Sequence, residues 1–230
     1  MVEIFAIRLI DDEAFSKVKP CLSEHLPENV IEKLGRFRNP PAMQRNMLGE
    51  VLCRAVVAQK EGIPAKTVST YRTEKGKPYY TDLKQWHFNI SHSAEWVVMA
   101  FSDEELGIDI EKIKPINYHL AKRFFSGEEN VRLNEFEEPR KLHYFFDLWT
   151  LKESYLKYLG KGLTKSLRTF TIHDVNGRFF LKHDEEHDSD VHFRQFVVGG
   201  DCKLSVCADS ETFAENILFL TIDELLTLLT

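Results

Sequence analysis

Residues 108–111 alternate between isoleucine and acidic side chains, a pattern typical of a half-buried β-strand. Successive side chains of a strand point to opposite faces, so Asp109 and Glu111 share one face, roughly 6.8 Å apart along the chain. Ile108 and Ile110 then point the other way, into a core. The segment therefore requires a sheet with an apolar face that is covered and two carboxylates on the other face.

Strands and a helix are predicted before this segment. Residues 86–92 and 96–101 are rich in strand-forming residues around a short polar turn, which favours two adjacent strands. Asn39 is followed by two prolines, and apolar residues then recur at helical spacing. These features predict a helix over residues 41–60 with Asn39 as its N-cap.

The second half begins with helices of its own. A helix is predicted over residues 117–125, and Ser126 with Glu129 forms a capping-box pattern for the next one. A longer helix is predicted over residues 141–159, because Gly160 provides a stop signal directly after it.

The rest of the chain is predicted to be mostly strand, in segments 169–173, 177–182, 191–198, 203–208 and 217–226. Both halves therefore run from helix into strands, which indicates two similar subdomains. Because no proline- or glycine-rich linker separates them, we expect one shared interface between residues 1–112 and residues 113–230.

Composition excludes several classes of protein. With 43% hydrophobic residues the chain can bury a core, yet no apolar run approaches the ~20 residues of a membrane helix. An acid, Glu3, lies where a signal peptide has basic residues, so a cytoplasmic protein is expected. The net charge of −6 argues against a nucleic-acid binder, although basic residues cluster near Lys33, Lys75 and Lys157.

Cysteine and histidine patterns predict no zinc site. The four cysteines form no C-x-x-C pair, so reduced, buried thiols are expected. Residues 183–187 formally match the H-x-x-E-H zinc pattern, which needs a helix to bring its two histidines together. These residues lie between two strand-like segments and are predicted to form an acidic loop.

Asp109 and Glu111 are candidates for binding a cation. Two acids on one face repel each other unless positive charge lies between them, and an all-oxygen ligand set suits a hard cation such as Mg²⁺. A solvated edge strand is the alternative interpretation of an isolated D-x-E pattern.

Glu153 and Lys157 form a second constellation on the predicted helix 141–159. They are four residues apart and therefore neighbours on one face, which ordinarily makes a weak surface pair. Trp149 precedes Glu153 by one turn on the same side, so this face is expected to be partly apolar and covered. A covered acid beside a covered base is a better candidate for proton transfer.

Residues 89–93, Asn-Ile-Ser-His-Ser, form a third motif at the end of a predicted strand. Backbone N–H groups and the His92 imidazole of such a turn can bind a phosphate. An ordinary surface histidine in a polar turn is the alternative.

Together these motifs resemble the Sfp-type 4′-phosphopantetheinyl transferases, the class that serves nonribosomal peptide and polyketide synthetases in antibiotic biosynthesis. The matching segments follow in the family's order: residues 74–78, 88–93, 107–112, 121–126 and 149–162. The resemblance implies an α+β fold of two similar, pseudo-twofold-related subdomains with coenzyme A in the cleft between them.

The resemblance also implies site residues. Mg²⁺, or Mn²⁺ in its place, would be held by Asp109, Glu111 and Glu153. The catalytic residues would be Glu153, Lys157 and His92. Coenzyme A would contact a larger set of residues: Lys33, Arg45, Lys75, Gly76, Lys77, Ser91, His92, Asp109 and Lys157.

The implied reaction is attack by a serine hydroxyl of an apo carrier protein on the β-phosphorus of coenzyme A, releasing adenosine 3′,5′-bisphosphate. Glu153 would take the serine proton, directly or through a water on the metal, and Lys157 would neutralise or protonate the departing phosphate.

The carrier is expected to dock on residues 160–168 of a monomeric enzyme. Because such carriers are typically acidic, lysines between 152 and 168, including Lys161 and Lys165, would face it. Leu163 and Leu167 would meet the hydrophobic helix of the carrier.

One departure and two alternatives accompany the resemblance. Family members place two basic residues three apart before the Arg-Phe pair, whereas this chain has Val30 and Lys33, which puts the strength of 3′-phosphate binding in doubt. A Mg²⁺-dependent hydrolase of nucleotide pyrophosphates could use the same groups with water as nucleophile. A non-catalytic carrier-binding module is disfavoured, because such a module has no use for three acidic metal ligands.

Overall fold

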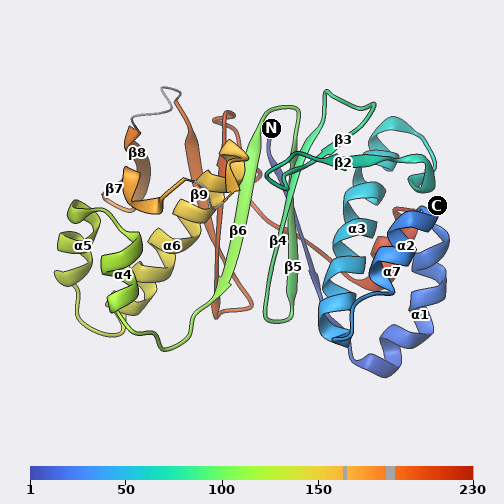
Figure 1. Ribbon diagram of the computed structural model, residues 1–230, viewed down its shortest axis with the longest axis horizontal. Coiled ribbons are helices and arrows are strands. Elements are labelled where there is room, and N and C mark those ends of the chain that lie inside the picture. The colour runs from blue at the N-terminus through green and yellow to red at the C-terminus, as the bar shows by residue number, and fades with distance from the viewer. Residues whose placement is uncertain (163–164, 185–189, 230) are drawn as a thin grey trace.

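Two β-sheets pack face to face, and each is covered on its outer face by a long helix (Figure 1). The computed structural model describes residues 1–162, 165–184 and 190–229. Helix α3 (Pro40–Glu61) covers the first sheet and helix α6 (Arg140–Leu159) covers the second. Among these residues no helix is long and apolar enough to cross a membrane.

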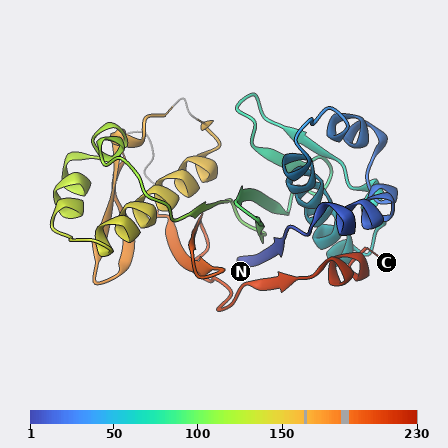
Figure 2. The ribbon, with the colours of Figure 1, turned by 90° about the horizontal axis from the view of Figure 1, so that it is seen from below.

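The first sheet has four strands in the order β11-β1-β5-β4. Their bounds are Glu3–Arg8 for β1, His87–Ser93 for β4, Trp96–Ser102 for β5 and Leu218–Leu220 for β11. Strand β1 pairs antiparallel with β5 and parallel with β11, so the C-terminal segment completes a sheet begun at the N-terminus. Figure 2 shows this segment running beside β1.

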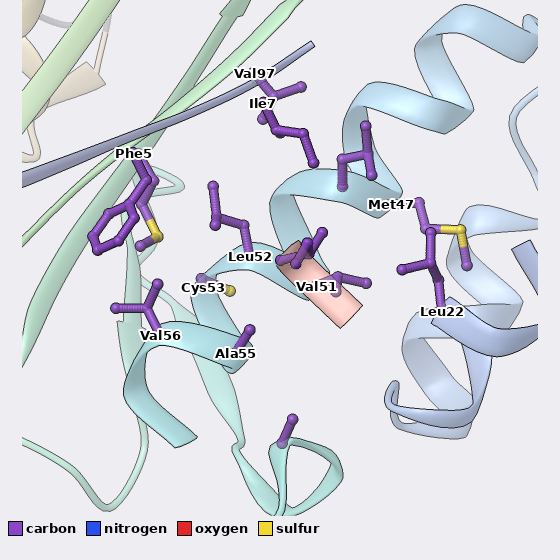
Figure 3. Close-up of a cluster of buried hydrophobic side chains, with 14 of the residues drawn as sticks. Phe5, Ile7, Leu22, Met47, Val51, Leu52, Cys53, Ala55, Val56 and Val97 are labelled. Carbon is purple, nitrogen blue, oxygen red and sulfur yellow. The ribbon is translucent and has the colours of Figure 1, made fainter. Parts of the chain in front are cut away.

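The outer face of the first sheet packs on helices. They are α1 (Asp12–Glu24), α2 (Glu28–Leu34), α3 and α7 (Ile222–Thr227). Figure 3 shows Ile7 of β1 and Val97 of β5 on the side of the sheet that faces Val51 and Leu52 of α3, with Phe5 nearer Val56, all 6% exposed or less. The burial of aliphatic side chains from both layers stabilises this half.

The second sheet has five strands in the order β6-β10-β9-β8-β7. Their bounds are Leu106–Lys112, Phe170–Val175, Arg178–Asp184, His192–Val198 and Cys202–Ala208 for β6 to β10 in chain order. Helix α6 packs on β6 and β10, with α4 (His119–Phe124) and α5 (Gly127–Asn134) beside it.

A third apolar layer lies between the two sheets. Ile108 and Ile110 are fully buried there against Ile4, Val98 and Leu204, which confirms their predicted direction. Asp109 and Glu111 consequently face α6 rather than the inter-sheet core.

The predicted helix signals are confirmed at both long helices. The Asn39 side chain accepts a hydrogen bond from the Ala42 N–H, and α3 ends at Gly62. Helix α6 ends at Gly160 in the left-handed conformation, φ 63°. The Ser126–Glu129 capping box is present at the start of α5.

Three expectations need correction. Residues 217–226 were expected as strand, but a Thr221–Glu224 capping box starts α7 there and only β11 is extended. Because β11 and α7 pack on the first sheet, the last part of residues 113–230 lies with the first half. Cys21 is exposed on α1, whereas the other three thiols are buried as expected.

Two short segments complete the description. Strands β2 (Thr70–Arg72) and β3 (Pro78–Tyr80) form a hairpin that projects beside α3. In the predicted loop over residues 183–187, residues 183–184 end β8, and 185–187 lie outside the described residues.

Candidate active site

Close contact at Gly107 positions α6 over β6. A Cβ atom at this position would lie 2.2 Å from the Ser154 carbonyl oxygen and 2.3 Å from the Tyr158 nitrogen. Only glycine allows the helix backbone to approach the strand this closely. As a result, Glu153 and Lys157 of α6 lie against the acidic face of β6.

Asp109 is the most deeply buried acid of the site, with 5% of its surface exposed. Its Oδ1 accepts hydrogen bonds from Lys157 Nζ at 2.7 Å and from Ser91 Oγ at 3.1 Å. Its Oδ2 is buried and has no hydrogen-bond partner among the residues that the structure describes. Burial outweighs the neighbouring ammonium and raises the pKa of the carboxyl group.

Glu111 and Glu153 are electrostatically coupled to Asp109. Burial, followed by the Asp109 charge, raises the pKa of Glu111. The same two causes, with a further contribution from Glu111, raise the pKa of Glu153 to about 7 despite the nearby Lys157. Three acids that oppose one another's ionisation form a site that positive charge would stabilise.

The oxygen atoms of the three carboxylates suit a hard cation, although they are not already arranged at coordination distance around one point. The carboxylates supply oxygen ligands, as Mg²⁺ prefers, and Asp109 Oδ2, which no described residue hydrogen-bonds, is available as a ligand. In the part of the chain that the structure describes, no three His, Cys, Asp or Glu side chains already converge at coordination distance. The Lys157 ammonium is instead paired with Asp109.

A pocket of about 370 Å³ opens next to Lys157. Its walls come from α3, the β2–β3 hairpin, β4 and the end of α6. It brings together six of the nine predicted coenzyme A contacts: Arg45, Lys75, Gly76, Lys77, His92 and Lys157. Ser91 and Asp109 lie directly behind Lys157, whereas Lys33, exposed on α2, does not line the pocket.

The hairpin lysines differ in availability. Lys75 is exposed beside Gly76, whose φ of 90° makes the tight turn between β2 and β3. Lys77 is buried and donates to Glu105 and to the Tyr158 carbonyl oxygen. Its ammonium therefore ties the hairpin to α6, which sequence reasoning did not anticipate.

His92 and Arg45 both line the pocket. Arg45 Nη1 donates to the Ala94 carbonyl oxygen at 3.2 Å, which holds the guanidinium near the β4–β5 turn. Partial desolvation, with the charges of Arg45 and Lys157, lowers the pKa of His92. This shift favours the neutral form of the imidazole.

The expected docking surface over residues 160–168 is only partly available. Lys165 and Leu167 were expected to contact the carrier, but they are only 5% and 6% exposed, so their side chains do not face a partner. Leu163 lies outside the described residues. Arg168 is exposed and Lys161 is half-buried.

Lys152, expected to face the carrier, is fully buried. Its Nζ donates to both Glu129 carboxylate oxygens, at 2.7 and 2.8 Å, and to the Phe170 carbonyl oxygen at 2.8 Å. Burial lowers the pKa of Lys152 to about 8, although Glu129 opposes this shift. The pair joins α5, α6 and β7 in the second half.

Sequence reasoning missed polar residues around the acids. Lys203 lies opposite Glu111 in the β6–β10 register and forms an ion pair of 2.6 Å with Asp147 of α6. Ser93 Oγ donates to Glu111 Oε2 at 3.1 Å. The alternation of Asn89, Ser91 and Ser93 along one strand face was the available signal for the latter contact.

Comparison with known proteins gives a consistent result. The family described as the 4′-phosphopantetheinyl transferase superfamily matches residues 105–207, and its N-terminal counterpart matches residues 13–104. The 4′-phosphopantetheinyl transferase Sfp of Bacillus subtilis is 37% identical over 196 residues, covering 85% of this chain and 87% of the relative.

A second relative matches nearly end to end. The 4′-phosphopantetheinyl transferase psf-1 of Bacillus pumilus is 33% identical over 229 residues, 98% of each chain. A solved holo-(acyl-carrier-protein) synthase from Bacillus anthracis covers 45% of this chain and 93% of its own, with 20% identity and a TM-score of 0.39, too distant to support a conclusion. On the identity and coverage of its relatives, this chain belongs to the 4′-phosphopantetheinyl transferase superfamily.

Proposed function

We propose that this chain transfers the 4′-phosphopantetheine arm of coenzyme A to a serine of apo carrier proteins. The observation that supports this most strongly is the position of Lys157, which lines a basic pocket and also hydrogen-bonds Asp109 within a group of three coupled acids. A nucleotide diphosphate in the pocket would thus meet the acids at one end.

Binding would depend on positive charge around the pocket. Arg45, Lys75 and Lys157 offer cationic donors to phosphate oxygens, and charge-assisted hydrogen bonds of this kind are the stronger ones. The His92 imidazole, in its neutral form, can donate one further hydrogen bond in the pocket. Lys33 is proposed to reach the 3′-phosphate from outside the pocket walls.

Proton transfer would fall to Glu153 and Lys157. A carboxyl group with a pKa of about 7 is well matched to accepting the carrier serine proton near neutral pH, directly or through a water. Lys157 can neutralise or protonate the departing adenosine 3′,5′-bisphosphate, because its ammonium lies between the pocket and Asp109.

Mg²⁺ or Mn²⁺ is proposed to be held by Asp109, Glu111 and Glu153. When bound, the ion supplies positive charge to the phosphoryl oxygens as negative charge develops there. Asp109 Oδ2, buried and without a hydrogen-bond partner in the described part of the chain, supports this assignment.

The carrier is proposed to dock at the exposed part of residues 160–168, with Lys161 and Arg168 facing its acidic surface. The enzyme would act as a cytoplasmic monomer on carrier domains of nonribosomal peptide synthetases. Charge reversal at Arg168 should then raise the KM for the carrier more than the KM for coenzyme A, and the defect should shrink at high salt.

Consumption of coenzyme A with and without an apo carrier tests the function. A transferase consumes coenzyme A only when the carrier is present, in a Mg²⁺-dependent manner, and Asp109→Ala should remove this activity without unfolding the protein. Equal consumption without carrier would instead assign the site to a pyrophosphate hydrolase.

A further inference from the structure

A seam of side-chain hydrogen bonds joins the two sheets. Strands β4 and β6 belong to different sheets but lie side by side. Three backbone N–H groups of β6 donate to side chains of β4: Ile108 to Asn89 Oδ1 at 3.1 Å, Ile110 to Ser91 Oγ at 3.3 Å and Lys112 to Ser93 Oγ at 3.1 Å. Both series advance by two residues, so one face of β4 supplies every acceptor.

The two serines do more than accept. A hydroxyl group accepts hydrogen bonds and also donates one, so it can bind an N–H and a carboxylate together. Ser91 Oγ donates to Asp109 Oδ1 and Ser93 Oγ donates to Glu111 Oε2, each at 3.1 Å. Each serine therefore binds the backbone N–H of one residue and the carboxylate of the residue before it.

Asn89 provides an internal comparison. Its Oδ1 accepts the Ile108 N–H, and the residue before Ile108 is Gly107, which has no side chain to orient. An amide acceptor is thus sufficient for the seam alone. Serine is present at the two positions where the preceding β6 residue is an acid.

We infer that Ser93 is a positioning residue, whose hydroxyl fixes the orientation of the Glu111 carboxylate from the opposite sheet. Ser91 has the equivalent place beside Asp109, but it also accepts a hydrogen bond from Lys157 Nζ at 2.9 Å. A substitution of Ser93 therefore tests the positioning of a carboxylate without removing a hydrogen bond to Lys157. The inference rests on the proposed function, because Glu111 is proposed there as a metal ligand.

Mn²⁺ binding by the purified full-length protein, measured by electron paramagnetic resonance without carrier or coenzyme A, tests the inference. Removing a hydrogen-bond partner of a metal ligand typically weakens metal affinity about ten- to a hundredfold, and Ser93→Ala should lose affinity in that range. Ser93→Thr retains the hydroxyl and should restore binding. Asn89→Ala removes a seam acceptor without a carboxylate partner and should keep wild-type Mn²⁺ affinity.

Thermal unfolding of the same variants separates positioning from stability. Both alanine variants should unfold at lower temperature, because each leaves a backbone N–H without its acceptor. Wild-type Mn²⁺ affinity in Ser93→Ala, or an equal loss in Asn89→Ala, would overturn the role of Ser93 and leave the proposed function intact. If the wild type binds no Mn²⁺ and still transfers the phosphopantetheine arm in the presence of chelator, the proposed metal site is wrong, and so is the role of Ser93.

Discussion

Replacing Glu153 by glutamine should stabilise the metal-free protein above neutral pH while abolishing transfer. Burial and the neighbouring acids raise the pKa of Glu153 from 4.5 to about 7, so ionising this group costs free energy in the folded protein. Each pKa unit corresponds to about 1.36 kcal/mol, which sets an upper limit of about 3 kcal/mol. Because Glu153 is only half-buried, solvent screening should reduce the effect to about 1–2 kcal/mol.

The sign of the pH dependence follows from proton binding. Between pH 4.5 and about 7 the folded state holds the Glu153 proton more tightly than the unfolded state, so this group lowers stability as pH rises through that window. Glutamine remains neutral throughout. The stability difference between variant and wild type should therefore be small near pH 4.5 and reach its maximum above pH 7.

Urea denaturation in chelator at pH 5 and pH 8 measures this difference. With a slope of about 1–3 kcal/mol per molar urea, the midpoint of Glu153→Gln should rise by roughly 0.5–1 M at pH 8. Glu24→Gln, at an exposed helix end remote from the three acids, is the control and should show no such rise. A wild-type midpoint for Glu153→Gln at pH 8 would refute the assignment of Glu153 to a group of mutually repelling acids.

Three further predictions test separate parts of the structure. Gly107→Ala should lower the free energy of unfolding, measured by urea denaturation, by at least about 1–3 kcal/mol and should remove transfer, because the added Cβ would collide with the α6 backbone. A variant that is as stable and as active as the wild type would contradict this contact. Glu129→Ala should lower the free energy of unfolding by about 3–5 kcal/mol in the same assay, since the buried Lys152 ammonium loses its carboxylate partner and keeps only the Phe170 carbonyl oxygen. Lys33→Ala should reduce the preference for coenzyme A over dephospho-coenzyme A about ten- to a hundredfold in kcat/KM, whereas an unchanged preference would assign the 3′-phosphate to Arg45 or Lys75.

Local signals predicted much of the fold. Asn39 and Gly160 define helix ends through their own backbone and side-chain chemistry, and Ile108 and Ile110 define a buried strand face by alternation. Such features depend on neighbours within a few residues. The parallel pairing of β1 with β11 depends on residues more than 200 positions apart, and no local pattern encodes it.

The site could be predicted in its residues more than in its contacts. The motifs identified Asp109, Glu153 and Lys157, which the structure brings together. The alternation of Asn89, Ser91 and Ser93 marked one polar face of β4, but it could not identify the partners of that face, because β4 lies beside β6 of a different sheet. The buried positions of Lys165 and Leu167 also escaped prediction, because a segment after a helix-ending glycine has no periodicity that reveals its buried side.

The most direct test of the proposed reaction is the intact mass of an apo carrier protein after incubation with this enzyme, coenzyme A and Mg²⁺. The carrier should gain the mass of one phosphopantetheine arm, with one equivalent of adenosine 3′,5′-bisphosphate released. A carrier with its acceptor serine replaced by alanine should gain nothing and release no nucleotide. Release of the nucleotide without any gain in carrier mass would contradict transfer and assign hydrolysis to the site.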